Sequence, residues 1–541
     1  MDSALGRTLL RLVGACLLAV AVVGLVAPRA VNTPYHWYVV VPVCLLLLAG
    51  AVFVRLPRWV RPRWVGLLLA VVGGVVATLV GLAGRYDYGW DAHVVMGLAR
   101  DLHAGRDLGV GGYDYLSLYP NNLPLLAIDR AGVEVGSWLG WSPDAVLIGL
   151  NGACVMVTLL AVDALVRRAR GPGAAIGAQV VTLVLVGTSP WLAVPYTDYF
   201  AMPFLAGGVA LAGRALLPGA ASAGEVSARA RTARVLTWVA AVVCYGIAYA
   251  IKTTPSVVVI ATVLTVVVAV FDGDHAPRGR VTALAGCVVA VVVFLGIAVA
   301  TPVVSARAAG VEASHLRTDA TPPVVWWLAN GMNERVGHDG VVSYGTYSGA
   351  MVEAIAGRTP DQMVDYARTY IADRWAERGP GGMLAFYADK VAWNWGDGMF
   401  WAWGEGGDSL PGQLADADGV VGIVHSLNGF HGSAYGWRAD VTQGLWLAVL
   451  LVAGTGLLRA PYRRDVLLVA LTVLGIATFT LLFQGRSRYV FSFAPLVVAL
   501  AAMVRVRAGT RRRRLGAVIA PSGATPDATS DATSDATPDA G

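Results

Sequence analysis

Residues 61–91 read RPRWVGLLLAVVGGVVATLVGLAGRYDYGWD, and this stretch decides the fold. From Trp64 to Gly84 it contains 21 residues without a charge. At 1.5 Å per residue, an α-helix of that length crosses a bilayer core about 30 Å thick. Any open backbone conformation in lipid would leave N–H and C=O groups without partners. The stretch therefore predicts a membrane-spanning helix that emerges at two acids, Asp87 and Asp91.

Similar apolar runs recur along the whole chain. Of its 541 residues, 56% are hydrophobic and only 14% are charged, a composition that excludes a soluble globular enzyme. The runs do not alternate polar and apolar residues, which excludes a β-barrel. The sequence predicts an all-α polytopic membrane protein with about twelve transmembrane helices, near residues 8–27, 37–54, 64–84, 143–166, 174–194, 200–217, 235–251, 255–271, 281–302, 442–458, 466–484 and 489–504.

Arginines mark one side of the predicted membrane. They cluster in the loop after every second span and again after the last span. The positive-inside rule places these loops, and both termini, in the cytoplasm. Thirty-nine arginines stand against two lysines, a bias typical of GC-rich coding DNA. We therefore expect a multi-pass protein of a bacterial plasma membrane.

This topology divides the chain into six parts. They are N-terminal transmembrane helices (1–84), a first extracytoplasmic loop (85–142), central transmembrane helices (143–302), a large Trp-rich acidic extracytoplasmic loop (303–441), C-terminal transmembrane helices (442–504), and a basic, then low-complexity tail (505–541) predicted to be disordered in the cytoplasm. Within the large loop, Thr359-Pro360-Asp361-Gln362 predicts the start of a helix that ends near Gly379.

Cysteine placement and net charge exclude several classes of function. All five cysteines lie inside apolar runs, which argues against a disulfide framework and a thiolate metal site. The net charge of +6 comes from arginines beside the spans and so does not indicate nucleic-acid binding.

Three acids are expected near the outer membrane surface. Asp87 and Asp91 follow the third span, where they could serve as a general base or a metal carboxylate. The alternative is a helix N-cap for Asp91 and an ordinary loop acid for Asp87. Asp198 lies in a short loop between spans, where an acid is costly unless it is paired or hydrated. An interfacial cap is the alternative there.

Three cations are predicted on the same outer side, where positive charge is disfavoured. They are Lys252, Arg486 and Arg488. A bound phosphate would explain them, because arginine offers paired donors to such an anion. Snorkelling toward lipid headgroups is the alternative. The turn Tyr119-Pro120-Asn121-Asn122 lies nearby in the first loop, and its two amides could bind sugar hydroxyls.

At these residues the chain resembles membrane-embedded glycosyltransferases of the C structural class (GT-C), relatives of protein O-mannosyltransferases and aminoarabinose transferases. Asp87 or Asp91 matches the acid of the first outer loop in that class, Asp198 matches a later acid, and Arg488-Tyr489 matches an Arg-Tyr pair. The chain is still more similar to a family of uncharacterised bacterial polytopic proteins, through Tyr-Pro-Asn-Asn at 119–122, Trp-Trp-Leu-Ala-Asn-Gly-Met-Asn at 326–333 and Trp-Gly-Asp-Gly at 395–398.

The resemblance implies an inverting transfer of a hexosyl or pentosyl group from a polyprenyl-phosphate sugar to a cell-envelope glycan, lipid or protein. Asp91 or Asp87 would be the base, and Asp198 would orient the acceptor or share a divalent metal ion with Asp91. The phosphate would be bound by the three cations, and the acceptor or sugar by Tyr119, Asn121, Asn122, Trp395 and Asp397. No other cofactor is implied. A transporter or flippase of lipid-linked sugars is the alternative, since twelve spans suit one equally well.

Overall fold

The computed structural model describes residues 3–26, 35–53, 57, 61–216, 228–271, 277–336, 341–402 and 417–504. Residues 1–506 form one body, and 507–541 form a separate unit. The predicted tail, 505–541, lies outside the described residues. The division at residues 85, 142, 303 and 441 remains a prediction.

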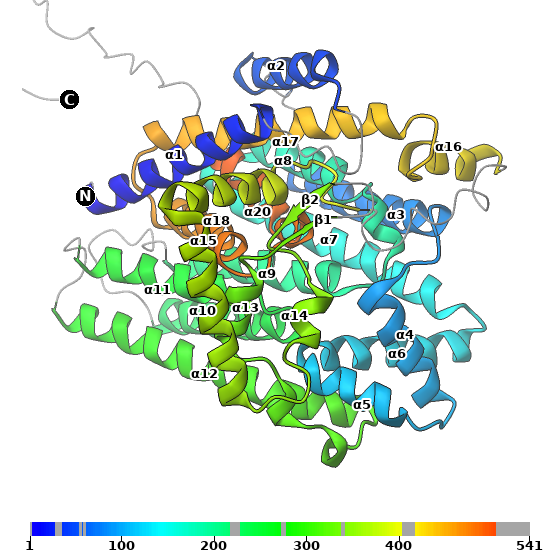
Figure 1. The fold of residues 1–541 in the computed structure, drawn as a ribbon. Helices are drawn as coiled ribbons and strands as arrows, with labels where there is room; N and C mark the ends of the chain where they lie inside the picture. The colour runs from blue at the N-terminus through cyan, green and yellow to red at the C-terminus, as the bar shows by residue number, and fades with distance from the viewer. Residues whose placement is uncertain are drawn as a thin grey trace, which may run out of the picture. The chain divides into compact units, whose positions relative to one another are not determined.

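The described chain is almost entirely helical, which confirms the predicted fold class (Figure 1). A two-stranded antiparallel hairpin, β1 (Glu334–Val336) with β2 (Val342–Tyr344), is a small addition to it. The helices are α1 (Ala4–Val26), α2 (Trp37–Phe53), α3 (Arg63–Ala83), α4 (Trp90–His103), α5 (Gly109–Leu118), α6 (Leu123–Leu139), α7 (Pro143–Arg170), α8 (Pro172–Leu185), α9 (Thr197–Leu216), α10 (Ala228–Ile251), α11 (Ser256–Phe271), α12 (Pro277–Ala309), α13 (Val324–Asn330), α14 (Gly349–Glu353), α15 (Pro360–Trp395), α16 (Gly419–Asn428), α17 (Tyr435–Arg459), α18 (Arg464–Leu482), α19 (Ser487–Phe491) and α20 (Ala494–Met503), with 3-10 turns η2 (Pro120–Asn122), η3 (Pro190–Ala193), η4 (Ala313–His315) and η5 (Thr318–Ala320).

All twelve predicted spans fall on helices, but the helices differ in length. In the described part of the chain, eight are long and apolar enough to cross a membrane, and these are α1, α3, α7, α9, α10, α12, α17 and α18. The other four predicted spans correspond to the shorter apolar helices α2, α8, α11 and α20. With ten residues, α20 is only about 15 Å long.

Prolines explain why three of these helices are short. Pro190 opens the η3 turn after α8, Pro255 stands between α10 and α11, and Pro495 lies in the first turn of α20, just after α19 ends. Each proline lacks the N–H that would continue the preceding helix. Such irregular backbone is tolerated at membrane depth where protein surrounds it. A prediction from hydropathy alone does not detect the breaks at Pro190 and Pro495, because the sequence on both sides of each of these prolines is largely apolar.

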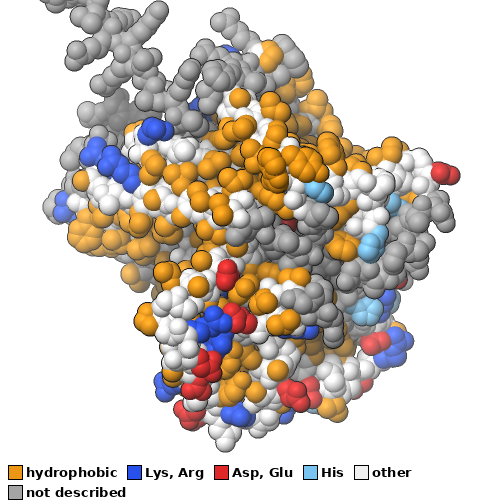
Figure 2. Space-filling model, turned by 45° about the horizontal axis from the view of Figure 1, so that its top comes forward, with side chains coloured by type: hydrophobic (Ala, Val, Ile, Leu, Met, Phe, Trp, Pro, Cys, Tyr) orange, Lys and Arg blue, Asp and Glu red, His pale blue; other side chains and the backbone are white. Residues whose placement is uncertain are grey.

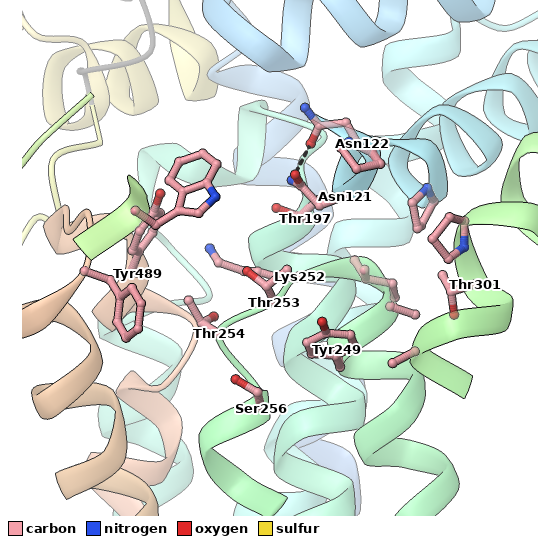
Figure 3. Close-up of a pocket in the computed structure, with 18 of the residues that line it drawn as sticks. Asn121, Asn122, Thr197, Tyr249, Lys252, Thr253, Thr254, Ser256, Thr301 and Tyr489 are labelled. Carbon is pink, nitrogen blue, oxygen red and sulfur yellow. Dashed lines mark hydrogen bonds between the residues drawn. The ribbon is translucent and has the colours of Figure 1, made fainter. Parts of the chain in front are cut away.

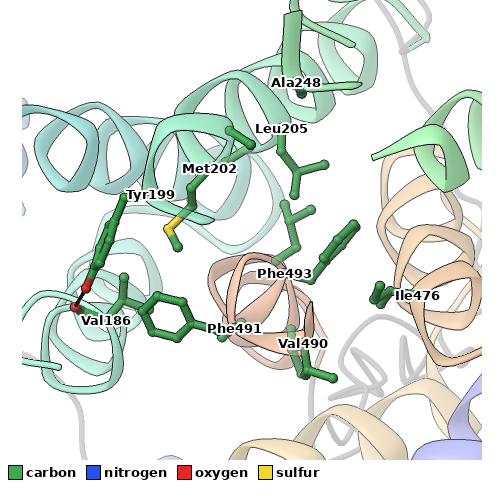
Figure 4. Packing of buried hydrophobic residues seen from close by; sticks show 14 of the residues in the cluster. Val186, Tyr199, Met202, Leu205, Ala248, Ile476, Val490, Phe491 and Phe493 are labelled. Carbon is green, nitrogen blue, oxygen red and sulfur yellow. Dashed lines mark hydrogen bonds between the residues drawn. The ribbon is translucent and has the colours of Figure 1, made fainter. Parts of the chain in front are cut away.

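The break between α19 and α20 is packed inside the bundle (Figure 4). Phe491 contacts the ring of Tyr199 on α9 with centroids 5.3 Å apart, and the Tyr199 hydroxyl donates to the Val186 carbonyl just after α8. Phe493 is fully buried near Ile476 of α18. The segment that carries Arg488 is therefore held rigidly among α8, α9 and α18.

Apolar side chains also cover much of the surface (Figure 2). On the face shown, hydrophobic side chains spread over the upper part, whereas Asp and Glu gather at the lower end. Many large apolar side chains of α3, α10 and α12 are exposed. Such a surface fits a protein whose helices face lipid.

The helix predicted from residue 360 forms with the expected start. The Thr359 hydroxyl accepts a hydrogen bond from the backbone N–H of Gln362. In return, the Gln362 side-chain oxygen accepts one from the backbone N–H of Thr359. At Gly379 the backbone leaves the helical region with φ of 62°, as the Gly-Pro pair predicts. The chain then resumes a helix that runs to Trp395, because Pro380 is compatible with the first turn of a new helix. The sequence did not predict this second helix.

Candidate functional site

A cavity of about 610 Å³ lies where several helices end (Figure 3). Its lining includes the polar side chains of Asn121, Lys252 and Arg488 and a larger number of apolar ones. Those apolar walls come from α10, α12 and α18 and from the turn after α18, with Tyr249, Phe294, Leu295, Ala298, Phe479 and Phe483. The cavity thus combines two cations with an extensive apolar lining.

Asp198 holds the two cations together. It lies in the first turn of α9, where the helix dipole favours an acid, and its side chain is only 1% exposed. Its Oδ1 accepts from Ser492 Oγ at 3.0 Å and forms an ion pair with Lys252. Arg488 Nε lies 3.7 Å from the Asp198 Oδ2. A buried carboxylate needs such partners, because an unpaired charge in this environment is strongly unfavourable.

The two cations exceed the charge of Asp198. Among the described residues that line the cavity, only Lys252 and Arg488 are charged. Both also lie over aromatic rings, since Lys252 Nζ is 5.0 Å from the Tyr489 ring centre and Arg488 Cζ is 4.7 Å from that of Tyr196. The cluster of Lys252, Arg488 and Asp198 therefore carries one net positive charge, and all three side chains are largely buried.

Arg486 lies apart from this pair. Its guanidinium stacks 4.4 Å over the ring of Trp401, and the residue does not line the cavity. Of the three cations that the sequence placed at one phosphate, the structure thus brings together Lys252 and Arg488 and separates Arg486 from them.

Asp91 is positioned by two tyrosines that the sequence analysis missed. Tyr115 donates to its Oδ1 at 2.8 Å and Tyr196 to its Oδ2 at 3.1 Å. The residue lies in the first turn of α4, and Gly89 is the N-cap, so the N-cap interpretation of Asp91 is wrong. Asp87, in contrast, is exposed, and within the described residues the structure gives it neither a hydrogen bond nor an ion pair.

A chain of hydrogen bonds runs from the cavity wall to Asp91. The Asn121 amide donates to Asn122 Oδ1 at 3.2 Å, and the Asn122 amide donates to the Tyr115 hydroxyl at 2.7 Å. The Tyr115 oxygen accepts from Asn122, so its own proton is directed to Asp91. Burial and the nearby carboxylate raise the pKa of Tyr115, which keeps it a neutral donor. The two asparagines therefore orient the acid as well as line the cavity.

Tyr196 connects the acid with the cations. Its hydroxyl donates to Asp91, and its ring lies beneath the Arg488 guanidinium. The Pro195-Tyr196-Thr197-Asp198 loop contains the only sequence signal for this link, because Tyr196 stands two residues before the predicted acid. Ser492 gives no comparable signal, since a serine within an apolar run is common.

Trp395 and Asp397 do not line the cavity. Trp395 is 2% exposed and stacks on Trp446 with ring centres 6.1 Å apart. Asp397 accepts from the backbone N–H groups of Met399 at 2.9 Å and Trp401 at 2.6 Å. It thereby holds a turn in which Phe400 and Trp401 adopt positive φ angles of 55° and 56°. Asp397 thus fixes the backbone of the turn that places Trp401 against Arg486, and Trp395 packs on Trp446 of α17.

The acids are not arranged as an evident metal centre. Within the described part of the chain, no three His, Cys, Asp or Glu side chains come together. Asp198 already faces Lys252, Arg488 and Ser492, and a third cation there would be repelled. This donor set does not fit a divalent ion shared by Asp198 and Asp91.

Comparisons with known proteins give one family and one distant structure. A family model described as "conserved hypothetical integral membrane protein" matches residues 25–508. No curated protein matches. The archaeal oligosaccharyltransferase AglB from Archaeoglobus fulgidus, solved with an inhibitory peptide and a dolichol-phosphate, matches 80% of this chain at 14% identity and a TM-score of 0.32. The match spans half the length of that protein.

Proposed function

The chain belongs to this family of conserved integral membrane proteins, and we propose that it is a membrane-embedded glycosyltransferase. It transfers a sugar from a polyprenyl-phosphate donor to a cell-envelope acceptor. One observation carries this proposal: a single cavity joins two buried cations to an extended apolar wall and lies one tyrosine away from a hydrogen-bonded acid. A phosphate attached to a long isoprenoid has the same division into a charged head and an apolar chain.

The donor occupies the cavity with its phosphate between Lys252 and Arg488. Its isoprenoid chain follows the apolar side chains of α10, α12 and α18. Asp198 acts as a positioning residue, because its carboxylate holds both cations. Without that carboxylate, two buried cations so close together would repel each other.

Asp91 is the general base of the transfer. An acceptor hydroxyl gives its proton to the Asp91 carboxylate while its oxygen attacks the anomeric carbon from the face opposite the phosphate. The bond between that carbon and the phosphate oxygen breaks, and polyprenyl phosphate leaves with the electron pair. Lys252 and Arg488 stabilise the charge that develops on the phosphate. The sugar is therefore transferred with inversion.

The cellular setting follows the arginine distribution. We place the cavity at the extracytoplasmic face of a bacterial plasma membrane, with both termini in the cytoplasm. Nucleotide sugars are absent on that face, which is why the donor is a lipid.

Reconstitution of the full chain in liposomes tests the proposal. Polyprenyl-phosphate sugars isolated from the producing cell should lose their labelled sugar to envelope material from the same cell. A donor that crosses the bilayer with its sugar still attached would instead identify a flippase. If the labelled sugar stays on the lipid and the lipid stays in its leaflet, neither function holds.

Replacing Asn122 with leucine tests the hydrogen-bond chain. The change removes the amide that orients Tyr115, so we expect kcat for sugar transfer to fall about 5- to 10-fold, and KM for the donor should rise as well because Asn122 also lines the cavity. Steady-state kinetics in detergent measure both. Tyr115→Phe should give a similar loss. Equal kcat values for Asn122→Leu and the wild type would contradict the role of this chain.

A further inference from the structure

Trp90 stands next to the proposed base and is half exposed. Its ring is 51% exposed, although Asp91, the following residue, is turned inward toward Tyr115 and Tyr196. The backbone of Trp90 has a φ of 53°, a conformation that bulky residues rarely adopt. This backbone turns the ring outward at the point where α4 begins.

A second ring from a distant part of the chain meets Trp90. Tyr347, between β2 and α14, approaches it edge-on with ring centres 6.4 Å apart. Tyr347 also lies beside Tyr119, because it contributes, after burial itself, to the raised pKa of the Tyr119 phenol. The Tyr119 ring is in turn 5.3 Å from that of Tyr115. Four aromatic side chains thus extend from Asp91 outward.

These contacts distinguish Trp90 from a membrane-anchoring tryptophan. Neither α4 nor the segment that carries Tyr347 belongs to the helices long and apolar enough to cross a membrane. The ring packs on a segment of the predicted water-exposed loop rather than on a lipid-facing span. Its neighbours carry phenolic hydroxyls, which donate and accept hydrogen bonds.

We propose that Trp90 and Tyr347, backed by the buried phenol of Tyr119, form an acceptor subsite that binds a carbohydrate, so that the acceptor of the reaction is a glycan. A sugar ring stacks its C–H face on the Trp90 indole, and its hydroxyls face the phenol of Tyr347. The contacts from Trp90 through Tyr347, Tyr119 and Tyr115 end at the Asp91 carboxylate, so a glycan bound on Trp90 lies on the side of the molecule where the proposed base is held. This inference rests on the proposed function and specifies its acceptor.

Binding of oligosaccharides to the purified full chain in nanodiscs tests the subsite. The probe is the set of oligosaccharides released by mild acid from the envelope of the producing cell, and saturation-transfer NMR measures the binding. Trp90→Ala should weaken it roughly 10-fold or more, because most of the stacking surface is lost. Trp90→Phe should retain affinity within about 3-fold, since a ring remains. Trp138→Ala is the matched control, because Trp138 is exposed at the opposite end of α6 from Asn122.

Polyprenyl phosphate binding, measured on the same samples, separates this inference from the proposed function. Failure of the wild type to bind polyprenyl phosphate overturns the function itself. If the lipid binds but no oligosaccharide does, only the glycan acceptor is overturned. The same holds if Trp90→Ala binds oligosaccharides as well as the wild type does, or if envelope peptides bind in their place.

Discussion

Replacing Asp91 with asparagine is expected to lower kcat for sugar transfer about 10³-fold, the range observed when a general base is lost. The amide keeps the shape of the side chain but cannot take the proton of the acceptor hydroxyl. Because Asp91 does not line the donor cavity, the affinity for polyprenyl phosphate should stay within about 3-fold of the wild type. Single-turnover transfer from a labelled polyprenyl-phosphate sugar measures the chemical step directly.

Asp87→Asn is the matched control for this variant. Asp87 lies four residues earlier and is exposed, so its replacement should leave the transfer rate close to that of the wild type. The pair decides between the two acids that the sequence could not separate. If Asp87→Asn loses activity and Asp91→Asn keeps it, the base is Asp87; if both keep it, the reaction does not use an acid of this loop.

Replacing Arg488 with glutamine is expected to weaken polyprenyl phosphate binding about 10- to 100-fold. The change removes one of the two cations of the cavity and, with it, a charge-assisted hydrogen bond worth about 1.5–3 kcal/mol. Isothermal calorimetry or a lipid-displacement assay in detergent gives the dissociation constant. The affinity of Arg488→Lys for polyprenyl phosphate should lie between that of the wild type and that of Arg488→Gln, because lysine keeps the charge but loses the planar pair of donors.

Arg486→Gln is the matched control here. Arg486 stands two residues away and stacks on Trp401 outside the cavity, so its loss should change the donor affinity less than 3-fold. Thermal unfolding of each variant checks that Asp198 tolerates the loss of Arg488. An unchanged affinity in a folded Arg488→Gln variant would show that the phosphate binds elsewhere.

Hydropathy and charge predict most of the fold of this chain, because both are properties of local sequence. Each apolar run forms a helix, and the capping residues at Thr359 and Gln362 start a helix where expected. The lengths of α8 and α20 were not predicted, since an apolar run continues through a proline while the helix does not.

The candidate site was predictable only in its charged residues. Lys252 and Arg488 stand out because cations are rare on the predicted outer side, and the structure joins both to Asp198. Tyr115 carries no such signal, and Tyr196 has only its place two residues before Asp198, because a tyrosine near a membrane surface usually has an interfacial role. Their importance follows from the tertiary contact with Asp91, which no local pattern contains. Trp395, predicted from a motif, is instead a buried part of the packing.

The excess of positive charge in the cavity has a kinetic consequence. A polyprenyl-phosphate sugar is a phosphodiester with one negative charge, whereas the polyprenyl phosphate left after transfer is a monoester with nearly two at neutral pH. Lys252 and Arg488 together exceed Asp198 by one charge. On the proposed function, we therefore expect them to bind the spent lipid more tightly than the donor. Turnover should then be limited by lipid departure, with a rapid first round followed by a slower steady state. Enzymes that remove polyprenyl phosphate from the membrane would accelerate it.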